Sequence, residues 1–127
     1  MENIKTIETP KTPSIIFDTE KGVLEITGKS APEESVEFYT PLMNLLDEYS
    51  KSPKNITNAV IKLEYFNTSS SKCLLYIFKR LEAIHKQGHQ VLIEWHYEEN
   101  DEDMLGAGED YQAIIPVPFK MVKIVVN

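Results

Sequence analysis

Four consecutive residues near the middle of this 127-residue chain carry hydroxyl groups, within the segment Asn67-Thr68-Ser69-Ser70-Ser71-Lys72. The run follows an apolar stretch and precedes an amphipathic one, which predicts that it joins a buried strand to a helix. Hydroxyls at a helix start accept hydrogen bonds from unpaired first-turn amides and contribute about 1 kcal/mol. Capping accounts for one hydroxyl of the run and leaves the others unexplained.

A phosphoacceptor is the functional interpretation of the same run. A phosphate at this place would meet free backbone amides and the positive end of the helix dipole. It would add about −1.5 to −2 charges, and Lys72 would neutralise part of them. The kinase supplies the chemistry, so the protein needs no catalytic group of its own. Residue chemistry alone leaves Thr68 and Ser69 both open, with Thr68 favoured because we expect it to lie before the helix and to protrude.

The helix that follows the run predicts a docking surface for partner proteins. An apolar stripe runs along one face, and Tyr76 falls off this stripe. Tyrosine and arginine are enriched at protein interfaces, although an ordinary solvated helix face fits the pattern equally well. The predicted partner-binding residues are Asn67, Ser69, Ser70, Ser71, Lys72, Tyr76, Lys79 and Arg80. Lys72 would lower the pKa of Cys73, but a cysteine that packs the helix is the commoner case.

An acidic segment between Glu94 and Tyr111 contains eight carboxylates and no lysine or arginine. Its spacing lacks the EF-hand pattern, so we expect a solvated, glycine-containing loop over Glu98–Asp110 that contributes to partner recognition. His85 and His89 are spaced i, i+4 near a helix end, where capping is more common than metal binding. No nucleophile elbow or phosphate-binding glycine loop occurs in the sequence. We therefore predict no metal site, no cofactor and no intrinsic enzyme activity.

The elements that position these residues form an α/β pattern. Ser14–Asp18 and Val23–Thr27 predict an N-terminal hairpin, after an extended lead-in over Thr6–Pro13. Ser30 and Glu33 predict a capping box for a first helix, which Pro41 should kink or restart. Three further strands are expected, with a parallel crossover through the second helix, which Gly88 should terminate. Those strands cover Ala59–Phe66, Val91–Trp95 and Phe119–Val126. We expect about five strands in a mixed sheet with helices packed on it.

Composition limits the classes of function. The net charge is −7 and the sequence pI is near 4.9, which argues against binding to nucleic acid or to anionic membranes. No apolar stretch is long enough to span a bilayer, and the start lacks the apolar core of a secretory signal. One cysteine cannot form an internal disulfide. These features predict a cytoplasmic protein in which residues 1–127 form a single domain.

Three segments, in order along nearly the whole chain, carry a family resemblance: Gly28-Lys29-Ser30-Ala31-Pro32-Glu33 with Phe38-Tyr39, Leu63-Glu64-Tyr65-Phe66-Asn67-Thr68-Ser69-Ser70-Ser71-Lys72, and Trp95-His96-Tyr97-Glu98-Glu99-Asn100-Asp101-Glu102-Asp103-Met104 with Gly108-Glu109-Asp110. Together they resemble the signature of the SiaC family of bacterial regulatory phosphoproteins. Ala31 replaces a tyrosine of the family pattern, and His96 stands between Trp95 and Tyr97. Neither departure touches the hydroxyl run.

This resemblance implies a STAS-like α/β fold similar to that of anti-sigma-factor antagonists. It also implies phosphorylation of the motif threonine, here Thr68, by a SiaB-type kinase, and reversal by a SiaA-type PP2C phosphatase. The unphosphorylated form is then expected to bind and activate a SiaD-type diguanylate cyclase in biofilm regulation. The alternatives are an antagonist that controls transcription through an anti-sigma kinase, and a small enzyme that uses the acidic segment with a metal.

Overall fold

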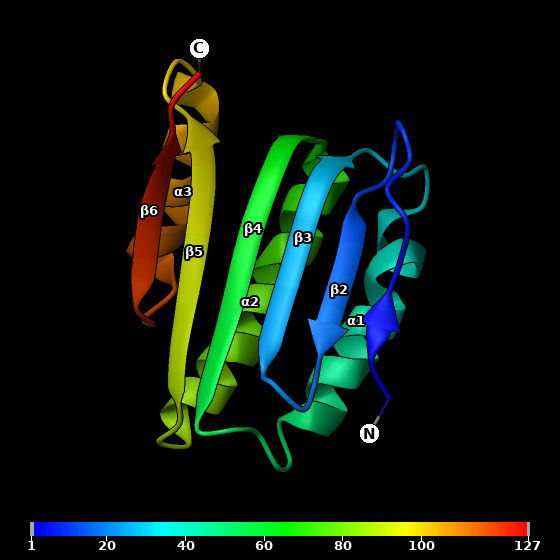
Figure 1. Ribbon diagram of the computed structural model, residues 1–127, viewed down its shortest axis with the longest axis vertical. Helices are drawn as coiled ribbons and strands as arrows, with labels where there is room; N and C mark the ends of the chain where they lie inside the picture. The colour runs from blue at the N-terminus through cyan, green and yellow to red at the C-terminus, as the bar shows by residue number, and fades with distance from the viewer. Residues whose placement is uncertain (1, 127) are drawn as a thin grey trace.

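The computed structural model describes residues 2–126 and has three helices packed on one face of a six-stranded sheet (Figure 1). The strands are β1 (Ile4–Lys5), β2 (Ser14–Asp18), β3 (Val23–Ser30), β4 (Ile56–Phe66), β5 (Gln90–Glu98) and β6 (Phe119–Ile124). The helices are α1 (Ser35–Tyr49), α2 (Thr68–Lys86) and α3 (Glu102–Ile114). The α/β class with helices packed on a mixed sheet is confirmed, with six strands where about five were expected. The additional strand is the short β1, which pairs with β2 at the sheet edge.

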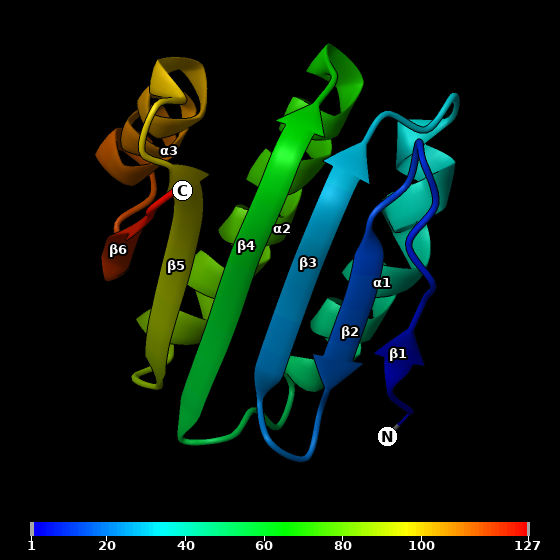
Figure 2. The same cartoon turned by 45° about the horizontal axis from the view of Figure 1, so that its top comes forward.

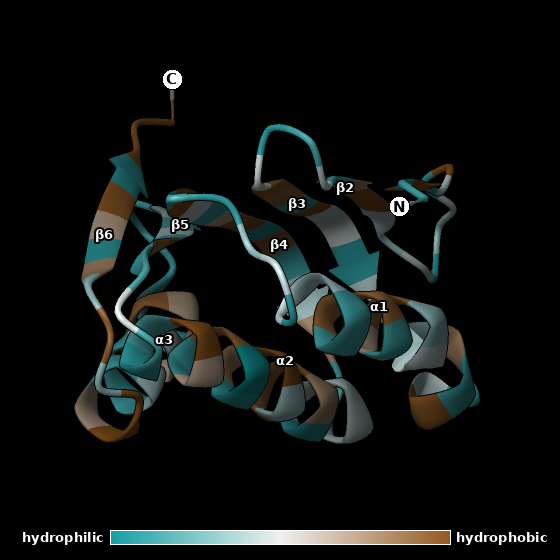
Figure 3. Ribbon diagram, turned by 90° about the horizontal axis from the view of Figure 1, so that it is seen from below, coloured by the Kyte–Doolittle hydropathy of each residue, from teal (hydrophilic) through white to brown (hydrophobic). Residues whose placement is uncertain are grey.

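The strands lie side by side in the order of the sequence, β1-β2-β3-β4-β5-β6. β1, β2 and β3 pair antiparallel, which confirms the predicted N-terminal hairpin, whereas β3, β4, β5 and β6 pair in parallel. Each parallel step crosses over through one helix. Right-handed crossovers that always advance toward the same edge place every helix on the same face of the sheet. Figure 3 shows the result, with α1, α2 and α3 on one side and the other side of the sheet uncovered.

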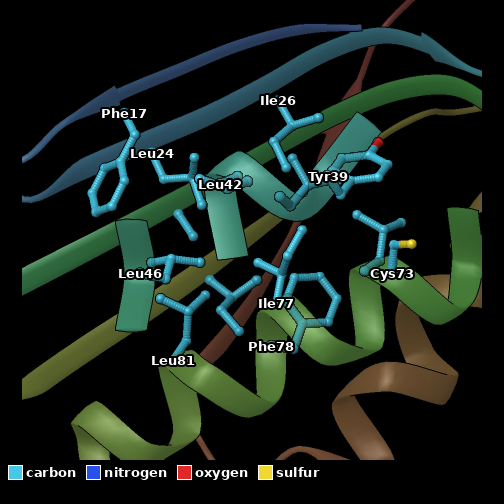
Figure 4. Packing of buried hydrophobic residues seen from close by; sticks show 14 of the residues in the cluster. Phe17, Leu24, Ile26, Tyr39, Leu42, Leu46, Cys73, Ile77, Phe78 and Leu81 are labelled. Atoms are coloured by element: carbon cyan, nitrogen blue, oxygen red, sulfur yellow. The ribbon is translucent and has the colours of Figure 1, made fainter. Parts of the chain in front are cut away.

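The core lies between the sheet and the helices. Alternate residues of each strand face the helices because side chains of a strand point to opposite faces in turn, and in β4 these are Thr57, Ala59, Ile61 and Leu63. In α1 the predicted apolar stripe from Tyr39 to Tyr49 is buried as expected. Figure 4 shows side chains from β2, β3, α1 and α2 meeting in this layer.

Two expectations about the first helix are wrong. Ser30 does not cap it: the residue is the last of β3 and is buried, and the helix begins at Ser35 with Glu34 before it. Pro41 does not interrupt the helix, which runs without a break from Ser35 to Tyr49. Pro41 lies on the exposed side of α1, where the carbonyl that loses its hydrogen bond remains accessible to water.

The expected acidic loop over Glu98–Asp110 is also wrong, because most of it is the helix α3. Asp101 caps this helix by accepting a hydrogen bond from the Met104 amide at 3.0 Å. Gly108 is buried inside it rather than supplying flexibility. A Cβ atom at position 108 would stand 2.4 Å from Cδ1 of Trp95, so only glycine lets α3 lie this close to β5.

Candidate functional site

The hydroxyl run forms the first turn of α2 at the end of β4. Asn67 is the residue that caps the helix, and its Oδ1 accepts a hydrogen bond from the Ser70 amide at 2.8 Å. The helix therefore begins at Thr68 and not after Ser71, which corrects the expectation that Thr68 precedes the helical backbone. Figure 2 shows α2 beginning where β4 ends, so the positive end of the helix dipole lies at this end of the sheet.

Ser70 points into the protein and joins a buried hydrogen-bond network. The Ser30 Oγ donates to the Ser70 Oγ at 2.8 Å, and the Ser70 Oγ donates to the Ser30 carbonyl at 3.1 Å. The Tyr39 hydroxyl lies 2.6 Å from the Ser30 Oγ. Because the Ser30 proton is already directed to Ser70, Tyr39 is the donor in that pair. Burial raises the pKa of Tyr39 to about 12, so the phenol keeps the proton that this bond requires.

Ser69 and Ser71 also have internal partners. The Ser69 Oγ donates to Asn67 Oδ1 at 3.2 Å and lies 2.7 Å from the Ser35 Oγ at the start of α1. The Ser71 Oγ donates to the Thr68 carbonyl at 2.6 Å. Thr68 is exposed, and within residues 2–126 its Oγ1 makes no hydrogen bond to the protein. Three hydroxyls of the run thus support the local structure, and that of Thr68 faces solvent without a bond to lose.

Sequence reasoning missed four of the residues that hold this turn in place: Ser30, Ser35, Tyr39 and Tyr111. The Tyr111 hydroxyl donates to the Ser71 carbonyl at 2.7 Å, so α3 anchors the first turn of α2 from the side opposite to α1. Burial also raises the pKa of Tyr111. The contacts of Ser30, Ser35 and Tyr111 with the run join residues 34 to 40 positions apart, and no local pattern indicates them. The one sequence signal for these anchoring residues is that Ser30 lies within a family segment. A serine at that place favours a helix cap rather than a buried hydrogen bond.

The predicted docking surface on α2 is only partly free. Tyr76 is 45% exposed and Lys72 is exposed one turn after Thr68. Arg80 instead forms an ion pair with Asp47 of α1, with 3.0 Å between Nε and Oδ1. Lys79 lies 3.7 Å from Glu82 on its own helix. The positive charge available to a partner is therefore concentrated at Lys72, close to the hydroxyl run.

Cys73 lies directly behind the run and is fully buried. Its burial raises the pKa of the thiol, which is opposite to the lowering by Lys72 that the sequence suggests. Among residues 2–126, no group of three or more histidine, cysteine or acidic side chains is arranged to hold a metal ion. In the same part of the chain, no helix combines the length and the apolar character needed to cross a membrane.

Comparisons with known proteins agree with this geometry. Residues 6–124 match the model of the SiaC family of regulatory phosphoproteins. An uncharacterized protein of Pseudomonas aeruginosa (strain UCBPP-PA14) is 29% identical over 119 residues, which is 94% of each chain. The solved structure of SiaC of Pseudomonas aeruginosa, 27% identical, has a TM-score of 0.89 and covers 98% of this chain and 100% of its own. SiaC in the crystal structure with the diguanylate cyclase SiaD, which it activates, is also 27% identical, with a TM-score of 0.90 over 95% of this chain and 99% of that chain. The chain therefore belongs to the SiaC family of regulatory phosphoproteins.

Proposed function

We propose that this protein is a non-catalytic cytoplasmic adaptor, one domain over residues 1–127, whose partner choice is controlled by phosphorylation of Thr68. A SiaB-type kinase adds the phosphate and a SiaA-type PP2C phosphatase removes it. The unphosphorylated form binds and activates a diguanylate cyclase. Support comes from the family, and from the SiaC relative that forms a complex with SiaD as its activator.

The observation that carries the choice of Thr68 is the hydrogen bonding of the run. Phosphorylation of Ser69 would remove its bond to Asn67 and disturb the contact with Ser35, and Ser70 is buried. Thr68 is exposed and loses no bond to the described chain when its hydroxyl is esterified. A phosphate at the first residue of α2 also meets the favourable end of the helix dipole. The modification therefore leaves the fold intact.

The switch acts through charge and bulk at the surface. A phosphate adds about −1.5 to −2 charges beside Lys72. Lys72 is exposed and forms no ion pair within residues 2–126. A partner that contacts the exposed Thr68 and Lys72 in the unmodified protein would then meet an added group and a reversed local charge. Release of the partner follows without any change in the backbone, because the first turn stays anchored by Ser30, Ser35 and Tyr111.

Two assays test this proposal. In the first, wild type, Thr68→Ala and Ser69→Ala are treated with the kinase, and intact mass is measured. Wild type and Ser69→Ala should gain about 80 mass units, the mass of one phosphoryl group, whereas Thr68→Ala should gain none. In the second, cyclic-di-GMP production by the cyclase is measured with wild type, Thr68→Ala, Thr68→Glu and the control Ser71→Ala. Wild type, Thr68→Ala and Ser71→Ala should activate the cyclase. Cyclic-di-GMP production with Thr68→Glu should be at least about tenfold lower.

Each assay has an outcome that contradicts the proposal. A phosphoryl group on Thr68→Ala would assign the acceptor to another hydroxyl. Equal activation by Thr68→Glu and wild type would remove the switch, even with Thr68 as acceptor. Capture of an anti-sigma kinase in place of a cyclase by Thr68→Ala would favour the transcriptional antagonist.

A further inference from the structure

The strands β4 and β5 separate before either of them ends. Their ladder runs from Ile56 opposite Gln90 to Ile61 opposite Trp95, and no later pair joins the two strands in the described chain. β4 nevertheless continues to Phe66 and β5 continues to Glu98. Figure 2 shows the two strands diverging toward the edge of the sheet where α2 begins. On this side, residues 62–66 of β4 have no strand partner in the described chain, and a register shift against β3 at Glu64 interrupts the regular alternation within them.

Backbone groups on both sides of this opening point into it. Successive residues of a strand direct their N–H and C=O groups to opposite neighbours. The Asn58 amide donates to Gly22 on the β3 side, and the Asn55 carbonyl accepts from Gln90 of β5. By this alternation, Leu63 faces β5 and His96 faces β4, beyond the last pair of the ladder. A segment of another chain would find strand hydrogen-bonding groups there.

The opening is a groove with side chains suited to one kind of occupant. One cavity of about 260 Å³ is lined by Glu64, Tyr65, Phe66, Asp101, Asp103 and Met104. A second cavity of about 150 Å³ adds Leu63, His96 and Glu98, and shares Glu64 and Asp101 with the first. Tyr65 is 54% exposed.

The groove is acidic, unlike the surface of α2 around Lys72. Four carboxylates line it, those of Glu64, Glu98, Asp101 and Asp103, against the single lysine Lys62. The His96 ring lies next to a further carboxylate, with 3.3 Å between its Nε2 and Glu94 Oε1. Phe66 and Met104 line the same cavity and contribute apolar atoms. Alternating basic and apolar side chains on an extended chain would match this lining, the basic ones pairing with the carboxylates and the apolar ones packing on Phe66 and Met104.

We propose that an extended basic segment of a partner protein binds in this groove and adds to the free edge of β4 as a short strand. Strand addition gives affinity through backbone hydrogen bonds, and the flanking side chains give specificity. β4 continues directly through Asn67 into Thr68. The bound segment therefore lies beside the phosphoacceptor, and this inference rests on the proposed function only for the identity of the partner.

A synthetic peptide tests the groove without any partner protein. The probe is a capped hexapeptide of alternating arginine and valine, and the matched control replaces arginine with glutamate. Amide chemical shifts of the ¹⁵N-labelled protein are followed during titration. Shifts with the arginine peptide should concentrate at residues 62–66 and 96–98, with a dissociation constant below about 1 mM. The glutamate peptide should leave these amides unchanged.

A charge-reversed pair of variants supplies the second arm. Glu64→Lys with Asp103→Lys alters two exposed groove residues, and neither side chain makes a hydrogen bond within residues 2–126. Glu20→Lys with Glu48→Lys makes the same change in net charge outside the groove, in the β2–β3 turn and near the end of α1. The first pair should weaken peptide binding roughly tenfold and the second should leave it unchanged. Melting curves and amide spectra of both variants confirm that they are folded.

Three outcomes overturn the inference: no shifts at residues 62–66, equal shifts with the glutamate peptide, or equal loss in both variant pairs. Groove shifts that appear with protein concentration alone would identify a second copy of this chain as the occupant, and would also overturn it. Hydrogen exchange with the cyclase separates this inference from the proposed function. If the cyclase is activated but the Leu63 amide is not protected from exchange, the bound segment does not come from the cyclase. The proposed phosphorylation switch is not contradicted by that result. Failure of the cyclase to bind contradicts the switch, while the peptide result still decides the groove.

Discussion

The Oγ of Ser30 donates a hydrogen bond to the Oγ of Ser70 over 2.8 Å, across 40 positions of sequence. This bond ties the end of β3 to the first turn of α2, and the Tyr39 hydroxyl extends it to α1. The turn that presents Thr68 is therefore held by buried side chains from two neighbouring elements. The Thr68 hydroxyl, which we propose as the phosphoacceptor, makes no hydrogen bond within residues 2–126 and is presented by this anchored turn.

Removal of the Ser30 hydroxyl should destabilise the protein. Ser30→Ala leaves the buried Tyr39 donor without a partner and removes one of the hydrogen bonds of the Ser70 Oγ, which keeps its bond to the carbonyl of residue 30. We expect a loss of about 1–3 kcal/mol in the free energy of unfolding, measured in urea. Ser71→Ala is the matched control: its hydroxyl bonds only to its own helix, and the change should stay within about 0.5 kcal/mol. Tyr39→Phe added to Ser30→Ala should cost less than the sum of the single changes, because the orphaned donor is gone. A fully additive double variant would contradict the network.

The two glycines of α3 should respond in opposite directions to alanine. Gly108→Ala places a Cβ 2.4 Å from Trp95 Cδ1 and 2.6 Å from Met121 Cε, so we expect a loss of about 1–3 kcal/mol and a change in tryptophan fluorescence. A Cβ at Gly106 meets nothing within 4 Å. Gly106→Ala should stabilise by about 0.5–1 kcal/mol, since alanine favours the helix. Equal effects of the two changes on the unfolding midpoint would refute the close approach of α3 to β5.

Glu82 should contribute stability that depends on pH. Its Oε2 lies 2.8 Å from the Lys86 Nζ, and this hydrogen bond, with further help from Lys79, lowers the pKa of the carboxyl below its ordinary value of 4.5. A pKa that is lower in the folded state stabilises the protein above the unfolded pKa, and the stabilisation is lost as pH falls through the folded pKa. The difference in unfolding free energy between wild type and Glu82→Gln should therefore shrink from about pH 7 to about pH 3.

The Lys86→Met variant provides the control for Glu82. Lys86→Met removes the principal partner of Glu82. In this background, the difference in unfolding free energy between the protein with Glu82 and its Glu82→Gln variant should depend less on pH. A difference that grows as the solution is acidified would show that the carboxyl has a raised pKa, against the ion pairs of α2.

Cys73 should be unreactive in the folded protein. It is fully buried, and burial raises the pKa of its thiol, so little thiolate forms at neutral pH. Alkylation by iodoacetamide, followed by mass, should be at least about 100-fold slower in native protein than in urea at the same pH. Alkylation at the denatured rate under native conditions would place the thiol at the surface.

The sequence by itself determined the elements whose signal is local. The stripe from Tyr39 to Tyr49 and the alternation in β4 mark buried faces directly, since burial follows the period of the backbone. The hairpin with Gly22 at positive φ is recognisable for the same reason, whereas α2 begins at Thr68 with Asn67 as its cap, earlier than the sequence suggested. The hydroxyl run also identifies the candidate site, because four adjacent hydroxyls exceed what one helix cap requires.

Only the tertiary structure decided what each hydroxyl and glycine does. Ser30 resembles a helix cap in sequence, but its partners lie on α1 and α2, and a hydroxyl bonds to whatever polar group the fold brings within reach. Gly108 has the sequence context of a flexible acidic loop, whereas the indole of Trp95 occupies the space that a side chain would need. The exposure of Thr68 and the separation of β4 from β5 likewise depend on the packing of distant segments. Local patterns encode periodicity and propensity, and the assignment of partners follows from the assembled chain.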